Sequence, residues 1–78
     1  MVDPLSAVPV YVQVADAVAA RIANGDLEPD RPIPSEEHLR QDFEVSRGTV
    51  RHAVALLRER GLVVTVPGRG TYVLDRSQ

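Results

Sequence analysis

The sequence contains no cysteine, no lysine and no tryptophan. Without cysteine, a disulfide framework, a thiol nucleophile and a cysteine-ligated zinc site are excluded. No apolar run approaches the length of a membrane span, and the chain does not open with a basic segment followed by an apolar one. We therefore expect a cytoplasmic protein that has no membrane partner.

Basic residues are outnumbered by acidic ones, and the net charge of −2 argues at first against a nucleic-acid partner. The distribution of the charges reverses this impression. Residues 1–39 carry two arginines and seven carboxylates, whereas residues 40–78 carry seven arginines and four carboxylates. A basic C-terminal half is where contacts with DNA are expected. All nine basic residues are arginine. Arginine suits guanine edges and phosphates, although a GC-rich genome would also favour arginine over lysine.

The first half of the chain predicts one helix and a connector. A chain of 78 residues, 44% of them apolar, is long enough for one small folded domain with a thin core. Its alanines favour a helix from about Pro9 to Asn24, with the proline in the first turn. The alternating valines of residues 8–14 keep a strand as the competing interpretation. Residues 26–34 contain three prolines, which exclude a helix but leave room for a very short strand near Ile33.

Two capping signals predict a helix-turn-helix in the middle of the chain. Ser35 begins a helix that ends near Phe43, and Ser46 begins a longer one that closes at Gly61. The tight turn between them is typical of this motif. The longer helix carries apolar residues at i, i+3, i+4 and i+7: Val50, Ala53, Val54 and Leu57.

The other side of the longer helix suits a DNA major groove. Its first two turns present Arg47, Gly48, Arg51 and His52, after the serine of the cap. A helix that anchors one face in a core and offers arginine and hydroxyl donors at its N-terminus has the character of a recognition helix. An ordinary amphipathic helix with a solvated arginine face is the plainer alternative.

The last third of the chain predicts a β-hairpin. Residues 62–66 and 71–74 are rich in β-branched and aromatic side chains, and a Gly-containing loop joins them. Three helices followed by a two-stranded hairpin give an α+β fold, mainly α, of the winged helix-turn-helix type. We place the domain at residues 8–75, with the helix-turn-helix at about 35–60, the wing at about 62–74, and flexible tails at 1–7 and 76–78.

Five motifs in order resemble the DNA-binding domain of the GntR family of bacterial transcriptional regulators. They are Pro9-x-Tyr11-x-Gln13, Gly25-x-Leu27-x-Pro29, Pro34-Ser35-Glu36-x-x-Leu39, Val45-Ser46-Arg47-x-Thr49-Val50-Arg51 and Pro67-Gly68-Arg69-Gly70-Thr71-Tyr72-Val73. The resemblance implies a sequence-specific repressor that binds a palindromic DNA operator as a dimer. It also implies a protein of the bacterial cytoplasm that associates with the nucleoid when bound to DNA. The sequence contains no Ser/His/Asp arrangement, phosphate-binding loop or cofactor motif, so we expect no enzyme activity, no cofactor and no metal.

The resemblance also implies roles for individual residues. Arg47 would contact a guanine edge, and Arg51 a phosphate or a base. Phosphates would be held by the three hydroxyl residues Ser35, Ser46 and Thr49. The wing turn Gly68-Arg69-Gly70 would enter the adjacent minor groove, where glycine permits close approach and arginine favours a narrow groove. His52 would either touch a phosphate or remain solvated.

Four positions depart from the family pattern. Glu37 stands where arginine is frequent, so it either withdraws from DNA or accepts from a cytosine amino group. Gly48 replaces a usual threonine. Glu44 and Asp30 replace glycines of the turn and the connector, and a left-handed conformation there costs glutamate roughly 1 kcal/mol.

The small-molecule effector domain that usually follows and dimerises the family's DNA-binding domain has no place in residues 75–78. We expect either a stand-alone protein or an excised domain. We also expect a weak homodimer formed through the first helix and the loose leader, residues 1–8, because Val8, Val10 and Val12 are more apolar residues than a thin core needs. The alternative function is a winged-helix protein-interaction or accessory module that pairs with a larger regulator. His38 and His52 lack any known spacing of metal ligands.

Overall fold

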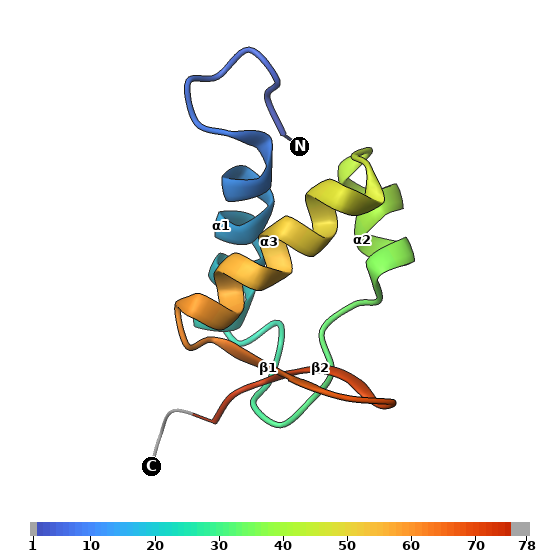
Figure 1. The fold of residues 1–78 in the computed structure, drawn as a ribbon. Helices are drawn as coiled ribbons and strands as arrows, with labels where there is room; N and C mark the ends of the chain where they lie inside the picture. Colours follow the sequence, from blue (N-terminus) through green and yellow to red (C-terminus); the bar gives the residue numbers. More distant parts are fainter. Residues whose placement is uncertain (1, 76–78) are drawn as a thin grey trace.

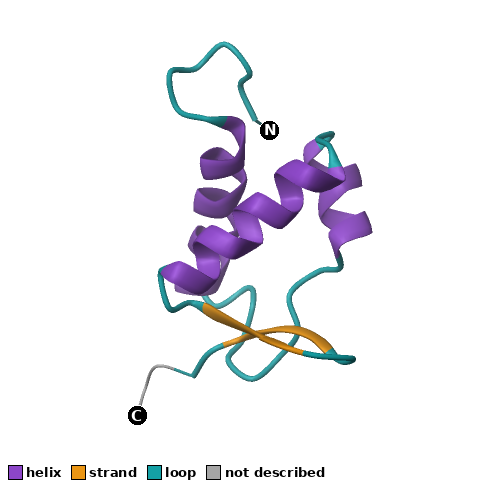
Figure 2. Cartoon of the chain, viewed as in Figure 1, coloured by secondary structure: helices purple, strands orange, loops and turns teal. Residues whose placement is uncertain are grey.

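The structure, a computed structural model, describes residues 2–75; the whole of the expected C-terminal tail, residues 76–78, lies outside the described residues. Residues 2–75 form three helices and one antiparallel hairpin (Figures 1 and 2). The elements are α1 (Val10–Ala23), α2 (Glu36–Phe43), α3 (Arg47–Glu59), β1 (Val63–Val66) and β2 (Gly70–Val73). The predicted winged helix-turn-helix fold is confirmed. None of these helices is long and apolar enough to cross a membrane.

The first helix, α1, includes three of the four alternating valines, Val10, Val12 and Val14, so the strand interpretation of that segment is wrong. Alanine-rich sequence favours the helix, and Val14, Ala15 and Val18 are buried on one face of it. Pro9 precedes the helix as its N-cap, with a non-helical ψ of 145°, instead of lying in the first turn. Because proline lacks an N–H, the N-cap residue itself adds no backbone donor that would need a partner.

The leader, which we expected to be loose, is attached to α1 through Gln13. The side-chain oxygen of Gln13 accepts from the Asp3 amide at 2.6 Å. Its side-chain nitrogen donates to the carbonyls of Asp3 and Val8, both at 2.8 Å. Val2 packs against the core, whereas Leu5 is 94% exposed. The amide of one glutamine thus fixes the path of the segment that precedes the helix.

The helix-turn-helix begins at the two predicted caps. Ser35 Oγ accepts from the His38 amide, and Ser46 Oγ accepts from the Thr49 amide, both at 3.1 Å. Between the two helices Glu44 adopts a left-handed conformation with φ of 55°. The sequence predicts this conformation for Glu44, and it tightens the turn enough for α2 to pack against α3.

The third helix ends in a Schellman motif at Gly61, whose φ is 75°. The Gly61 amide donates to the Arg58 carbonyl at 3.0 Å, and the Leu62 amide donates to the Leu57 carbonyl at 3.1 Å. These bonds satisfy the last carbonyls of the helix and turn the chain directly into β1.

The hairpin is anchored to the connector along its outer edge. Val63 pairs with Val73 and Val66 with Gly70 in the antiparallel register. Pro32 forms an isolated bridge with Tyr72, and the Ile33 amide donates to the Thr71 carbonyl at 2.9 Å. The short strand expected near Ile33 is therefore present as a single bridge. The connector reaches β2 through Asp30, which is left-handed as predicted, with φ of 64°.

The core lies where α3 crosses α1 and α2 above the hairpin (Figure 1). Its buried residues are Val14, Ala15, Val18, Ile33, Leu39, Val50, Ala53, Val54, Leu57, Val63 and Val73. The predicted stripe of α3 is buried in full, so the opposite face of that helix is left for solvent or a ligand.

Candidate nucleic-acid interface

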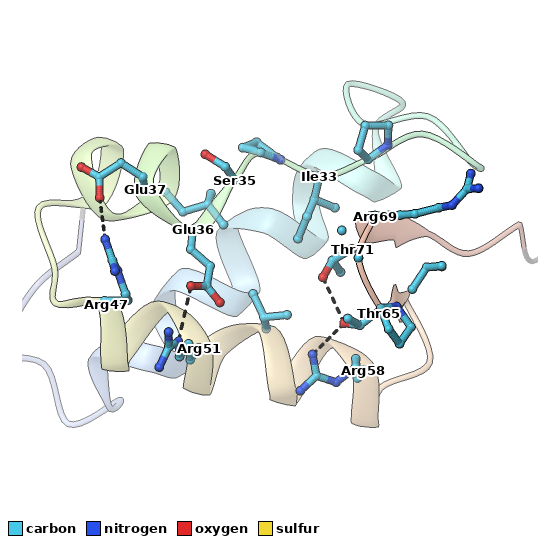
Figure 3. Close-up of a pocket in the computed structure, with 18 residues that line it drawn as sticks. Ile33, Ser35, Glu36, Glu37, Arg47, Arg51, Arg58, Thr65, Arg69 and Thr71 are labelled. Atoms are coloured by element: carbon cyan, nitrogen blue, oxygen red, sulfur yellow. Dashed lines mark hydrogen bonds and ion pairs between the residues drawn. The ribbon is translucent and has the colours of Figure 1, made fainter.

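A groove runs between the first turns of α2 and α3 on one side and the hairpin on the other (Figure 3). Its charged and hydroxyl residues are Ser35, Glu36, Glu37, Arg47, Arg51, Arg58, Thr65, Arg69 and Thr71. Four arginines face two glutamates there, whereas the whole chain has a net charge of −2. Four of the nine arginines are thus gathered on the face that carries the predicted recognition helix.

Three arginines of α3 project along this groove, two of them held by α2 and one by the hairpin (Figure 3). Arg47 Nη2 lies 3.2 Å from Glu37 Oε1, and Arg51 Nε lies 3.4 Å from Glu36 Oε1. Arg58 Nη1 donates to Thr65 Oγ1 at 2.9 Å, and this hydroxyl lies 3.0 Å from that of Thr71. The arginines of the N-terminal turns are therefore oriented by α2, and the last one connects α3 to the wing.

The carboxylate of Glu37 lies at the centre of the ionic contacts. Arg40 donates to both of its oxygens, Arg47 donates to Oε1, and Gln41 donates to Oε2 at 2.9 Å. Hydrogen bonds from Arg40, together with those from Arg47, hold the pKa of Glu37 at about 2, below its ordinary 4.5. Glu37 is therefore ionised at every physiological pH.

Arg69 at the wing tip differs from the arginines of α3. Within residues 2–75 its side chain has no hydrogen-bond or ion-pair partner, and Figure 3 shows it pointing away from them. Gly68 and Gly70 flank it with φ of 75° and 128°, conformations that favour glycine. Arg69 donates its backbone N–H to the Val66 carbonyl at 3.0 Å and closes a turn with Pro67 at its second position.

The predicted phosphate-binding hydroxyls belong to the helix caps. Ser46 Oγ accepts from the Thr49 amide and lies 3.0 Å from Thr49 Oγ1. A hydroxyl that accepts from the backbone keeps its own hydrogen for a second partner, so capping and phosphate binding are compatible. The first turn of α3 contains no acidic residue, unlike that of α2. Gly48 lies exposed in this turn, and an added Cβ would meet Ser46 Oγ only at 3.9 Å.

His52 lies on the side of α3 that faces α1. Its ring stacks on Tyr11, with centroids 3.5 Å apart and an angle of 6° between the planes. The imidazole remains exposed, but it does not line the groove. Within residues 2–75 no three histidine or acidic side chains come together in an arrangement that could hold a metal ion.

Seven of the eleven predicted site residues line the groove, and four do not. The former are Ser35, Glu37, Arg47, Arg51, Gly68, Arg69 and Gly70; the latter are Ser46, Gly48, Thr49 and His52. Sequence reasoning missed Glu36, Arg58, Thr65 and Thr71 as groove residues. A signal for Arg58 was present, because it follows Arg51 by seven residues and so lies on the same helical face.

Comparison with known proteins decides the family. The sequence profile of the bacterial regulatory proteins of the gntR family matches residues 10–73. The chain belongs to the GntR family. It is 40% identical over 72 residues to the HTH-type transcriptional repressor NagR of Bacillus subtilis (strain 168). It is 43% identical over 67 residues to the mannosyl-D-glycerate transport/metabolism system repressor MngR of Escherichia coli (strain K12).

These alignments cover 92% and 86% of this chain, but the chain spans only 30% and 28% of the two relatives. The structure is similar to the DNA-binding domain of AraR, solved in complex with operator ORX1. The TM-score is 0.84 at 41% identity, over 94% of this chain and 90% of that one. The family comprises DNA-binding transcription regulators and not enzymes, which confirms the function class predicted from the sequence.

Proposed function

We propose that this GntR-family chain represses transcription by binding a palindromic operator. In this proposal the N-terminal turns of α3 enter the major groove, and the wing tip enters the adjacent minor groove. The observation that carries it is the shared groove, in which Arg47 and Arg51 of α3 and Arg69 of the wing lie on one face. The assignment of these contacts is supported by the likeness to a domain solved with its operator.

Each contact follows from the chemistry of its side chain. Arg47 reads guanine O6 and N7, because its guanidinium projects from the first turn of α3. The Ser46 and Thr49 hydroxyls share one hydrogen bond with each other, and the hydrogen that remains is donated to a phosphate at the N-terminus of α3, where the helix dipole favours an anion. Ser35 does the same at α2, and Arg51 contacts a phosphate or a base. His52, exposed beside them, is available to a phosphate at the edge of the interface.

Selection from a random-sequence DNA library is the experiment that tests this function. We expect one enriched palindromic sequence. Its affinity should fall linearly with the logarithm of salt concentration, with a slope of about −0.9 for each phosphate neutralised. A chain that enriches no sequence and binds DNA without salt dependence would not be a regulator of this kind. In that case a protein-interaction module becomes the better interpretation.

Repression is supported by the names of the two relatives, both called repressors. We place the chain in the bacterial cytoplasm, where its operator lies. A reporter gene whose promoter overlaps the selected sequence should be expressed less when the chain is produced. Expression that rises instead would show an activator.

We further propose that two chains form a weak homodimer that is completed on the operator. One helix and one wing cover a single half-site, and modules of that size bury roughly 600–1,000 Å² of protein surface. Specific binding therefore needs two copies related by a two-fold axis. Leu5 and Val8, exposed to 94% and 43%, provide an apolar surface where the leader meets α1.

Sedimentation across a concentration series tests the homodimer, with and without a palindromic duplex. We expect a monomer when dilute and two chains on each palindrome. Leu5→Asp should weaken the pairing, whereas Leu74→Asp, at a position 37% exposed directly after β2, should not. A strict monomer that binds an isolated half-site as tightly as the palindrome would contradict the homodimer.

A further inference from the structure

A carboxylate at the edge of a DNA-binding groove is an unfavourable choice unless it has a use. Glu37 lies at this edge with its side chain 46% exposed, and phosphates would approach it as like charges. Its partner across the turn is Arg47, the residue assigned to base recognition. The use of Glu37 must therefore be sought in what it does to that arginine.

The hydrogen bonds of Glu37 leave its carboxylate with no spare acceptor site. Its two oxygens accept four bonds, two from Arg40 and one each from Gln41 and Arg47. An ionised carboxylate offers about four lone-pair positions, and all of them are taken. A cytosine amino group would have to displace an existing donor. Of the two roles open to Glu37 from the sequence, a direct base contact is thus the less favourable.

Three of the four bonds come from residues of α2 itself, one turn along the helix. Arg40 and Gln41 fix the carboxylate in place, and its Oε1 atom is presented to the neighbouring helix. Arg47 donates to it through Nη2 alone, and within residues 2–75 its other nitrogens have no partner. The guanidinium is therefore held at one end, while its remaining donors stay open to a ligand.

We propose that Glu37 is a positioning residue that determines specificity: fixed by Arg40 and Gln41, it orients Arg47 toward a base edge and away from phosphates. The inference rests on the proposed DNA-binding function. On the preferred site, Arg47 is already oriented and loses little side-chain freedom. On random DNA, it must leave Glu37 before it can neutralise a phosphate. Glu37 thus disfavours the non-specific complex more than the specific one.

Glu36 provides a matched control on the same turn. It carries the same charge and contacts Arg51 of the same recognition helix, but through one bond of 3.4 Å. Within the described residues, no second side chain donates to Glu36. Glu36→Gln therefore removes the same charge as Glu37→Gln without removing a fixed support.

The test compares wild type, Glu37→Gln and Glu36→Gln on the duplex selected from a random library and on random duplex DNA. The readout is the Kd on random DNA divided by the Kd on the selected duplex, measured across a salt series. We expect the ratio to fall roughly 5–10-fold in Glu37→Gln and less than about 2-fold in Glu36→Gln. The salt slope of Glu37→Gln on random DNA should steepen by about one phosphate, because the released Arg47 gains that contact.

Equal changes in both variants would reduce Glu37 to a general repulsive charge and overturn the inference, as would an unchanged ratio in Glu37→Gln. A second variant, Glu37→Asp, keeps the charge but has a shorter side chain that no longer reaches Arg47, and its Kd ratio should fall as well. A Kd ratio equal to that of the wild type would contradict the positioning role of Glu37. Thermal unfolding of each variant verifies that it folds. A wild-type chain that discriminates between no DNA sequences would overturn the proposed function itself, an outcome separate from these.

Discussion

The arginines of the recognition helix and the arginine of the wing are presented in opposite ways. Arg47 and Arg51 are each paired with a glutamate of α2, whereas Arg69 has no side-chain partner within residues 2–75. An arginine side chain carries about 2 kcal/mol of rotamer entropy, part of which binding removes. The paired arginines have already lost some of this freedom, so they suit contacts that require direction. The unpaired one provides charge that adapts to its surroundings.

The backbone shows the same contrast. The turn of the helix-turn-helix is fixed by two serine caps and by Glu44. The wing is held at its base by the connector and by Arg58, but its tip consists of Gly68, Arg69 and Gly70. A rigid helix start and an adaptable tip are what base recognition and minor-groove contact respectively require.

Of the variants considered, Arg47→Ala should have the largest effect on sequence discrimination. Loss of a bidentate guanine contact should cost roughly 1–3 kcal/mol on the preferred site and flatten the preference at one base pair. On random DNA the loss should be much smaller, because there the ion pair with Glu37 competes with the phosphate. Fluorescence anisotropy on single-base variants of the site measures both. Equal losses on both DNAs would make Arg47 a phosphate contact.

Arg69→Ala should weaken binding to preferred and random DNA by similar factors. The minor groove distinguishes little beyond A·T from G·C pairs, so the side chain contributes charge more than sequence recognition. The salt slope should become shallower by about one unit. Anisotropy titrations from low to high salt check this. If neither the affinity nor the slope changes, the wing tip lies outside the interface.

Glu44→Gly should stabilise the fold by up to about 1 kcal/mol, because glycine adopts the left-handed conformation without the cost that glutamate incurs. In a domain of this size, such a gain raises Tm by roughly 4–8 °C. Asp30→Gly, at the other left-handed position, should gain less, since aspartate tolerates this region better. Calorimetry ranks the two. A lower Tm in Glu44→Gly would mean that the side chain contributes more than its conformation costs.

The smallest expected effect is the loss of folding stability at acidic pH that follows from protonation of Glu37. The pKa of Glu37 is lowered from 4.5 to about 2 in the folded chain, so its ionised form stabilises the fold above pH 4.5. This contribution is lost as the pH falls from 4.5 toward 2. The Tm difference between wild type and Glu37→Gln should therefore be constant near neutral pH and shrink over that acidic range. A difference that persists at pH 2 would contradict the ion pair.

Local signals predicted most of this molecule. The caps Ser35 and Ser46 and the glycine Gly61 mark the helix ends correctly, because capping depends on bonds within a few residues. Arg47 and Arg69 were predicted because their neighbours form recognisable motifs, and both line the groove. The pairing of Glu37 with Arg47 spans ten residues and depends on how α2 packs against α3. No pattern in the sequence encodes that packing.

The same limit applies at the other end of the chain. The stacking of Tyr11 on His52 joins α1 to α3, and the bonds of Gln13 to the leader bridge ten residues to Asp3. Each contact requires two segments to meet in space, which periodicity does not report. Most of the predicted site residues thus line the groove, but the side chains of other elements that orient them could not be found from the sequence.

An NMR titration of the ¹⁵N-labelled chain with its selected duplex shows whether the start of α3 and the wing tip form the DNA-binding face. We expect the largest amide shift changes at residues 35–37, 46–52 and 67–71, with small changes along the exposed face of α1. Changes concentrated on α1, with residues 46–52 unaffected, would contradict this placement of the DNA-binding face.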